Sequence, residues 1–131
     1  MRPDGALRPS YAALVRHLAV PATTRPARWT ARWSTVHPGR LIVRPQCRAA
    51  DGVCRGRMSA SLRAGGLTDR LTKRSYRTST RHRTATLRIQ VSRTVRRRAR
   101  AASARGLVLR ERALRPAAAL RKVTLKLARP G

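Results

Sequence analysis

The sequence predicts a mostly disordered chain with short isolated helices at about 10–20 and 95–114, short strands at about 85–91 and 122–127, and no stable compact core. Two observations lead to this expectation. Leu, Val, Ile and Phe make up only 25 of the 131 residues, while 21 residues are Ala, which buries little area. The formal net charge is +28. Few bulky apolar residues combined with a high net charge are typical of disordered chains.

The charge imbalance determines which partners the chain is expected to have. Its 32 basic residues outnumber the four acidic ones, so like-charge repulsion opposes any compact state. The missing negative charge must come from outside the chain. We therefore expect polyanion partners, RNA or DNA first and an anionic membrane surface second, and no small-molecule substrate.

The bias in composition also has a genetic interpretation. Asn and Phe are absent, and Gly, Ala, Arg and Pro, which have GC-rich codons, account for 66 of the 131 residues. A shifted or antisense frame of a GC-rich gene yields a chain of this kind. An overlapping-frame product without a selected biochemical role is therefore the alternative to a functional basic protein.

Composition divides the chain into four segments. Residues 1–26 form an amphipathic N-terminal segment with features of a targeting sequence, and residues 27–69 form an irregular region containing Trp, Cys and Gly. Residues 70–115 are an Arg-rich basic region, and residues 116–131 are a short C-terminal strand or tail.

The helix expected at about 10–20 depends on apolar spacing. Apolar residues recur at i, i+3, i+4 and i+7 between Tyr11 and Leu18, and Pro21 ends the pattern. The segment is too short to span a membrane, and Arg16 interrupts it, so it is a poor secretory signal. An intracellular location is expected, which would be an organellar matrix, the nucleus or the nucleolus in a eukaryote and the cytoplasm in a bacterium.

A short tryptophan repeat suggests stacking. Residues 27–34 read ARWTARWS, and in a helix Trp29 would lie over Trp33. Arg beside Trp suits cation–π contacts, base stacking and membrane interfaces. Trp29, Trp33 and Tyr76 are therefore the candidate stacking residues. Membrane-surface action by this repeat or by the helix at 10–20 is a third functional hypothesis.

The two cysteines flank a turn signal, Asp51-Gly52. A four-residue loop over 49–52 would place Cys47 opposite Cys54 and permit a disulfide, whereas a two-residue loop would leave Cys47 unpaired. The sequence favours two reduced, incidental thiols over this disulfide. This spacing matches no zinc pattern, and no metal or cofactor is expected.

Alternating apolar and polar residues predict the two strands at 85–91 and 122–127. About thirty residues with a helical stretch separate them, a length that suits a β–α–β crossover. Residues 72–86 are mostly Ser, Thr and Arg, and we expect them to be extended or disordered.

The helix expected at 95–114 depends on small residues. From Val95 to Ala113 an apolar or small residue recurs at steps of three and four, and Pro116 should end the helix. Like charges on the remaining positions oppose this helix in water. A bound polyanion would favour it.

The sequence offers little material for catalysis. It has four carboxylates, three His and two Cys, and it lacks the motifs of serine hydrolases, zinc proteases, calcium loops and nucleotide-binding loops. We therefore expect no enzyme and no catalytic, cofactor-binding or metal-ligating residue.

The sequence favours a non-enzymatic protein that binds nucleic acid, RNA first, non-specifically through backbone phosphates. Residues 70–115 hold sixteen basic side chains and one acid, Glu111. Arginine can grip phosphate through two parallel hydrogen bonds. The candidate contact residues are Arg74, Arg77, Arg81, Arg83, Arg93, Arg96, Arg97, Arg98, Arg100 and Arg105.

Overall fold

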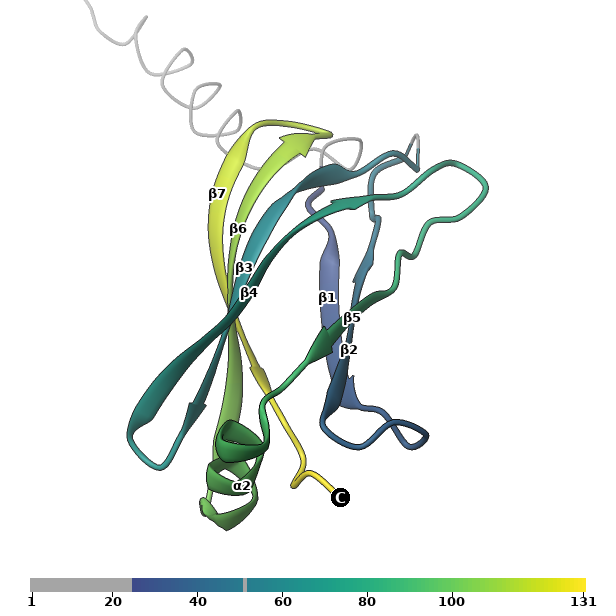
Figure 1. The fold of residues 1–131 in the computed structure, drawn as a ribbon. Coiled ribbons are helices and arrows are strands. Elements are labelled where there is room, and N and C mark those ends of the chain that lie inside the picture. Colours follow the sequence, from purple (N-terminus) through teal and green to yellow (C-terminus); the bar gives the residue numbers. More distant parts are fainter. Residues whose placement is uncertain (1–24, 51) are drawn as a thin grey trace, which may run out of the picture.

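The computed structural model describes residues 25–50 and 52–131, so the helix expected at about 10–20 lies outside the described residues. These residues form two antiparallel sheets that face each other, with one helix at one end (Figure 1). The expectation of a mostly disordered chain without a compact core is therefore wrong. So is the description of the protein as intrinsically disordered.

The smaller sheet has three strands. These are β1 (Arg28–Trp33), β2 (Arg40–Gln46) and β5 (Leu87–Gln90), in the order β1-β2-β5. Both strand pairs are antiparallel, with Val43 of β2 opposite Ala31 on one side and Leu87 on the other. We call this the small sheet.

The larger sheet has four strands and is also antiparallel. They are β3 (Arg55–Ala64), β4 (Leu67–Arg77), β6 (Arg105–Arg115) and β7 (Ala119–Lys126), in the order β4-β3-β6-β7. A Gly65-Gly66 turn, with φ of +59° and +78°, joins β3 to β4. Two left-handed residues in succession are what a tight hairpin requires. We call this the large sheet.

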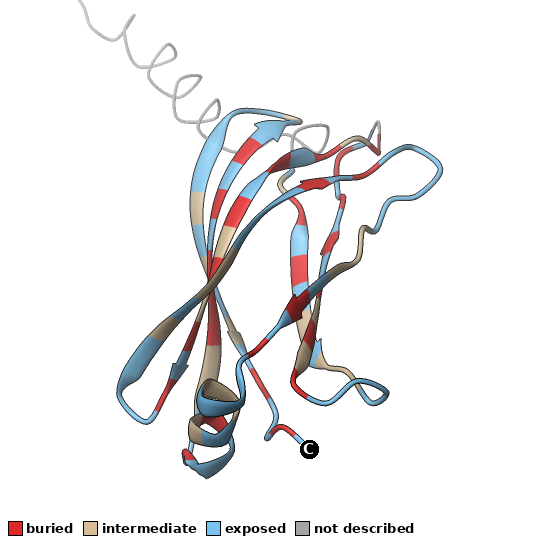
Figure 2. Ribbon diagram, viewed as in Figure 1, coloured by how far each residue is buried: buried red, intermediate tan, exposed pale blue. Residues whose placement is uncertain are grey.

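The core lies between the sheets, and Figure 2 shows buried residues alternating with exposed ones along the strands. The largest fully buried side chains include Leu41, Ile89, Leu62, Leu107 and Leu109. The bulky residues are few, but alternation places them on the inner faces and leaves the cations outside. Alanines contribute as well, because small side chains let the chain pack closely where they are buried. Composition alone does not reveal this segregation, and the expectation of disorder failed for that reason.

The helix expected at 95–114 is only half present. α2 spans Arg93–Ala101, and the Ser92 hydroxyl caps its start by accepting the Val95 N–H at 3.3 Å. Arg105 closes the other end by donating to two carbonyl oxygens of the last turn. From Arg105 onward the chain is strand β6, because pairing with β3 and β7 on both sides outweighs the weak helical seam.

The two predicted strands are present as β5 and β7, but the β–α–β crossover is wrong. β5 belongs to the small sheet and β7 to the large one, and both lie in antiparallel pairs. The connection between them contains both α2 and the whole of β6.

The tryptophan repeat is a strand, β1, and not a helix. Trp29 and Trp33 share a face because side chains alternate with a period of two. Trp29 is buried and meets the Tyr76 ring edge-on, with centroids 5.0 Å apart and planes at 85°. The first part of the tract at 72–86 is ordered as well, since β4 continues to Arg77.

A disulfide connects the end of β2 to the start of β3, and so links the two sheets covalently. Cys47 and Cys54 are buried, and their Cα atoms lie 5.5 Å apart. Between them the Gly52 N–H donates to the Ala49 carbonyl oxygen at 3.0 Å, and Gly52 has a φ of +74°. The cysteines are therefore oxidised, and the expectation of two reduced thiols is wrong.

Candidate nucleic-acid interface

The outward surface of the large sheet carries many exposed basic side chains. Where Met58, Leu62 and Leu109 point into the core, the alternate residues of the same strands point to solvent. Eleven exposed basic side chains lie on this surface, and all four strands contribute. We call them the large outer face: Arg55, Arg57, Arg63, Arg70, Lys73, Arg77, Arg110, Arg112, Arg115, Lys122 and Lys126.

Strand register brings like charges directly opposite each other on this face. Arg57 lies across from Arg112, and Arg110 lies across from Lys122. Directly opposite side chains have Cβ atoms about 5 Å apart, and like charges in such pairs destabilise a sheet. The arrangement therefore costs folding free energy unless an anion lies over the face.

No acidic side chain among the described residues relieves this repulsion. The two described acids are Asp69 and Glu111, and both carboxylates are engaged with arginines on other surfaces. Asp69 pairs with Arg98 of α2, which fastens the helix to β4. Counter-charge on the large outer face must therefore come from solvent ions or from a ligand.

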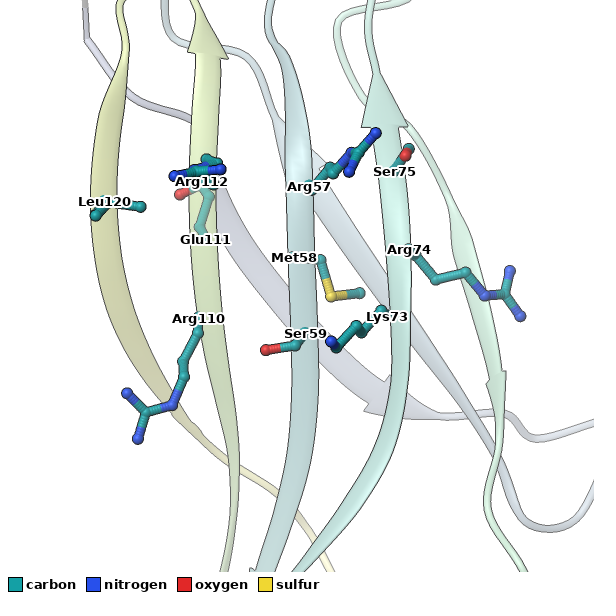
Figure 3. Close-up of a pocket in the computed structure, with 10 residues that line it drawn as sticks. All are labelled: Arg57, Met58, Ser59, Lys73, Arg74, Ser75, Arg110, Glu111, Arg112 and Leu120. Carbon is teal, nitrogen blue, oxygen red and sulfur yellow. The ribbon is translucent and has the colours of Figure 1, made fainter.

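The centre of the large outer face is hollowed by about 430 Å³ (Figure 3). Ser59 lies between two cations, with Lys73 opposite it on β4 and Arg110 opposite it on β6. Arginine, lysine and serine side chains are all donors to phosphate oxygens. The side chains around the hollow that point outward are Arg57, Ser59, Lys73, Ser75, Arg110, Arg112 and Leu120.

Behind this hollow, on the core side of the sheet, lies a buried polar cluster. Glu111 is buried and accepts hydrogen bonds from the Tyr76 hydroxyl and from Arg121 Nε, the latter at 2.8 Å. Arg121 also donates to the Ala27 carbonyl oxygen and so ties β7 to the residue preceding β1. Burial raises the pKa of Tyr76 well above its ordinary value, and the Glu111 carboxylate adds to the effect. The cluster stabilises the sheet and does not reach the outer face.

Helix α2 carries a second, smaller group of cations. Arg93, Arg96, Arg97 and Arg100 recur at i, i+3, i+4 and i+7 and border a hollow of about 300 Å³. The opposite side of the helix packs inward through buried Ala99. This single row belongs to one nine-residue helix, whereas the large outer face spans four strands.

The structure divides the sequence-predicted contact residues into two groups. Four guanidinium groups hold the fold together: Arg74 donates to the Arg88 carbonyl, Arg83 to Ala49, Arg98 to Asp69, and Arg105 to the end of α2. Arg96 belongs with these four, since it donates to the Gly131 carbonyl oxygen at 3.3 Å. The others are exposed to solvent, and they are Arg77, Arg81, Arg93, Arg97 and Arg100.

The candidate stacking residues lie away from the cationic surfaces. Trp29 and Tyr76 contact each other in the core. Trp33 is half-buried, and its indole N–H donates to the Ala128 carbonyl oxygen at 2.7 Å.

Sequence reasoning missed the centre of the large outer face. Arg57 lies outside residues 70–115, the segment that the sequence predicts to bind. Arg110 and Arg112 lie where the sequence predicts a helix. The available signal was the alternation at 105–115, where Leu107, Leu109 and Ala113 all take inward positions. That alternation was obscured by the three-and-four spacing of small residues in the same stretch.

Within the described ranges, no group of three or more His, Cys, Asp or Glu residues could hold a metal ion. The same ranges contain no helix with the length and apolar character needed to cross a membrane. Compared with known proteins, the chain matches no protein family, no curated protein and no solved structure with significance.

Proposed function

We propose that this protein binds nucleic acid, RNA first, through backbone phosphates on the large outer face. One observation carries the proposal: eleven cations from four strands share a surface that has no acidic side chain among the described residues. The phosphate backbones of nucleic acids are the ligands that such a surface attracts most strongly. No catalytic step is part of the proposal.

The ligand we favour is a duplex. Single-strand binding uses exposed aromatic rings on which bases stack. The described aromatic residues are Trp29, Trp33 and Tyr76, and none lies on the large outer face. Phosphate contacts without stacking suit the regular backbone of a double helix and carry no sequence information.

The disulfide bears on where this binding takes place. Buried disulfides such as Cys47–Cys54 are typical of proteins that fold in oxidising compartments. A setting of that kind differs from the intracellular location that the sequence favours. The protein would then bind nucleic acid outside the reducing cytosol.

The test is the salt dependence of binding to a fluorescent RNA duplex, measured by anisotropy on the full chain. If about seven of these cations contact phosphates, log K should fall with log[salt] at a slope near −6. Substituting Arg57→Gln, Arg110→Gln and Lys122→Gln together should reduce that slope by about 2.7 and weaken binding at least ~10-fold at ~0.1 M salt.

A matched variant removes the same charge from α2 through Arg93→Gln, Arg97→Gln and Arg100→Gln. This variant should lose less affinity for the duplex than the sheet variant, and its slope of log K against log[salt] should change less. The reason is that only the sheet residues lie directly opposite other cations on neighbouring strands. Equal losses would mean that total charge alone governs binding, as the overlapping-frame alternative requires. A salt-independent signal, or binding to anionic vesicles but not to RNA, would overturn the proposal.

A further inference from the structure

We propose that the protein bridges two nucleic-acid duplexes, holding one on each outer surface of its two-sheet fold. This inference rests on the proposed function, since the large outer face is the first of the two sites. It adds a second site on the opposite side of the molecule and a consequence, cross-linking, that a single face cannot produce.

The outward surface of the small sheet is cationic too. Arg28 and Arg32 on β1, Arg44 on β2 and Arg88 on β5 are exposed, and Arg40 is half-exposed. We call these five residues the small outer face. Their strand neighbours Trp29, Leu41, Val43 and Ile89 are buried, so alternation separates cations from core here as it does in the large sheet.

Register gathers these arginines into rows. Ile42 lies opposite Arg32 on one side and opposite Arg88 on the other, so two guanidinium groups flank one apolar residue. Arg44 lies opposite Thr30, whose hydroxyl is a further phosphate donor. Neither described acid, Asp69 or Glu111, belongs to this sheet.

A hollow extends the small outer face at one end. It has a volume of about 450 Å³ and is lined by Arg28, Gln46, Cys47, Arg48 and Arg83. Arg83 is engaged with the Ala49 carbonyl oxygen. The groups available to donate to phosphate oxygens here are therefore the guanidinium groups of Arg28 and Arg48 and the side-chain amide of Gln46. The hollow therefore adds polar donors next to the arginines that lie across the strands of the small sheet.

The two outer faces point in opposite directions, because the sheets pack face to face across the core (Figures 1 and 2). Packed sheets lie about 10 Å apart, which with arginine side chains on both sides puts the two cation layers roughly 20 Å apart. That distance exceeds the ~8 Å Debye length of physiological salt, so duplexes on the two sides scarcely repel each other.

One short duplex cannot occupy both faces. A double helix has a persistence length of about 150 base pairs, and wrapping around so thin a body would require a sharp bend. Each face must therefore hold a separate segment. With eleven cations against five, the large outer face fills first and the small outer face second.

The experiment uses two populations of RNA duplex of about 20 base pairs, stiff at that length, with donor dye on one and acceptor dye on the other. Energy transfer between duplexes reports bridging, and anisotropy of one labelled duplex reports the first binding event. With the wild-type protein, transfer should rise as protein is added and fall when duplex is in excess, because each protein molecule then holds a single duplex.

Three double variants of the full chain, each losing two charges, separate the sites. Arg44→Gln with Arg88→Gln should weaken second-site binding by roughly 60-fold at ~0.1 M salt and abolish transfer, while changing the first-site affinity less than about twofold. Arg110→Gln with Lys122→Gln should lower both signals. Arg25→Gln with Arg129→Gln removes exposed charges outside both faces and should change neither signal by more than about twofold.

The outcomes distinguish this inference from the proposed function. If the wild-type protein does not bind the duplex, both the proposed function and the bridging inference are refuted. Normal duplex binding without energy transfer would refute bridging alone. Undiminished transfer in the variant lacking Arg44 and Arg88 would also overturn the inference, because another surface or a second copy of the chain would then hold the second duplex. Thermal melting of each variant verifies that the fold persists.

Discussion

The Tyr76 hydroxyl should contribute strongly to stability through its hydrogen bond to Glu111, and Tyr76→Phe isolates that contribution. The substitution keeps the ring and its edge-on contact with Trp29 and removes only the donor. Glu111 is buried, so its carboxylate would lose one of its donors without gaining water. Hydrogen bonds to charged groups contribute about 1.5–3 kcal/mol, and we expect a loss of ~2 kcal/mol.

Urea and thermal unfolding, followed by tryptophan fluorescence, measure this loss. For a domain of about 100 residues, a loss of ~2 kcal/mol corresponds to a Tm lowered by roughly 8 °C. If the hydroxyl acts through Glu111, the cost of Tyr76→Phe should shrink in a Glu111→Gln background, because a neutral amide is a weaker acceptor. A Tm within about 1 °C of the wild type would refute the account of this buried cluster.

The remaining predictions concern the covalent and steric frame around that cluster. Gly56→Ala should lower the free energy of unfolding by at least ~2 kcal/mol in urea titrations, since the new Cβ would lie 2.8 Å from the Tyr76 hydroxyl; unchanged stability would contradict the tight packing there. Replacing Cys47 and Cys54 by Ser should cost about 2.5 kcal/mol for so short a loop, and a thiol assay on unfolded wild-type protein should find no free thiol. Because the pKa of Tyr76 lies above its ordinary value near 10, the phenol is kept neutral in the fold, and stability should be full below that pH and decline above it. In a Tyr11→Phe protein, which leaves Tyr76 as the sole tyrosine, phenolate absorbance should therefore appear only together with alkaline unfolding; ionisation near pH 10 with the fold intact would contradict this.

Local signals in the sequence were informative where one pattern dominated. The alternation at 85–91 and 122–127 indicated strands, and β5 and β7 lie there. At 105–115 two periodicities overlap, and the choice between helix and strand depends on partners far away in the sequence. Leu107 pairs with Leu62 on β3 and with Leu125 on β7, and no local pattern contains that information.

The expectation of disorder from composition was wrong because residue counts do not show which side chains are buried and which are exposed. A charge of +28 opposes folding, but alternation along the strands keeps the cations out of the core and directs them outward on two opposite faces. The same reasoning explains the candidate site. The arginine cluster at 93–100 is dense along the chain, whereas Arg57 and Arg112 are distant in sequence and meet only through the register of β3 and β6.

Arginine side-chain NMR during titration with an RNA duplex tests the central claim most directly, because each guanidinium Nε–Hε reports its own contact with phosphate. The account predicts that the signals of Arg57, Arg110 and Arg112 shift at the first additions of duplex, before those of Arg93, Arg97 and Arg100. Shifts spread evenly over the exposed arginines would contradict it, since they would mean that the register of the large sheet does not select where the polyanion binds.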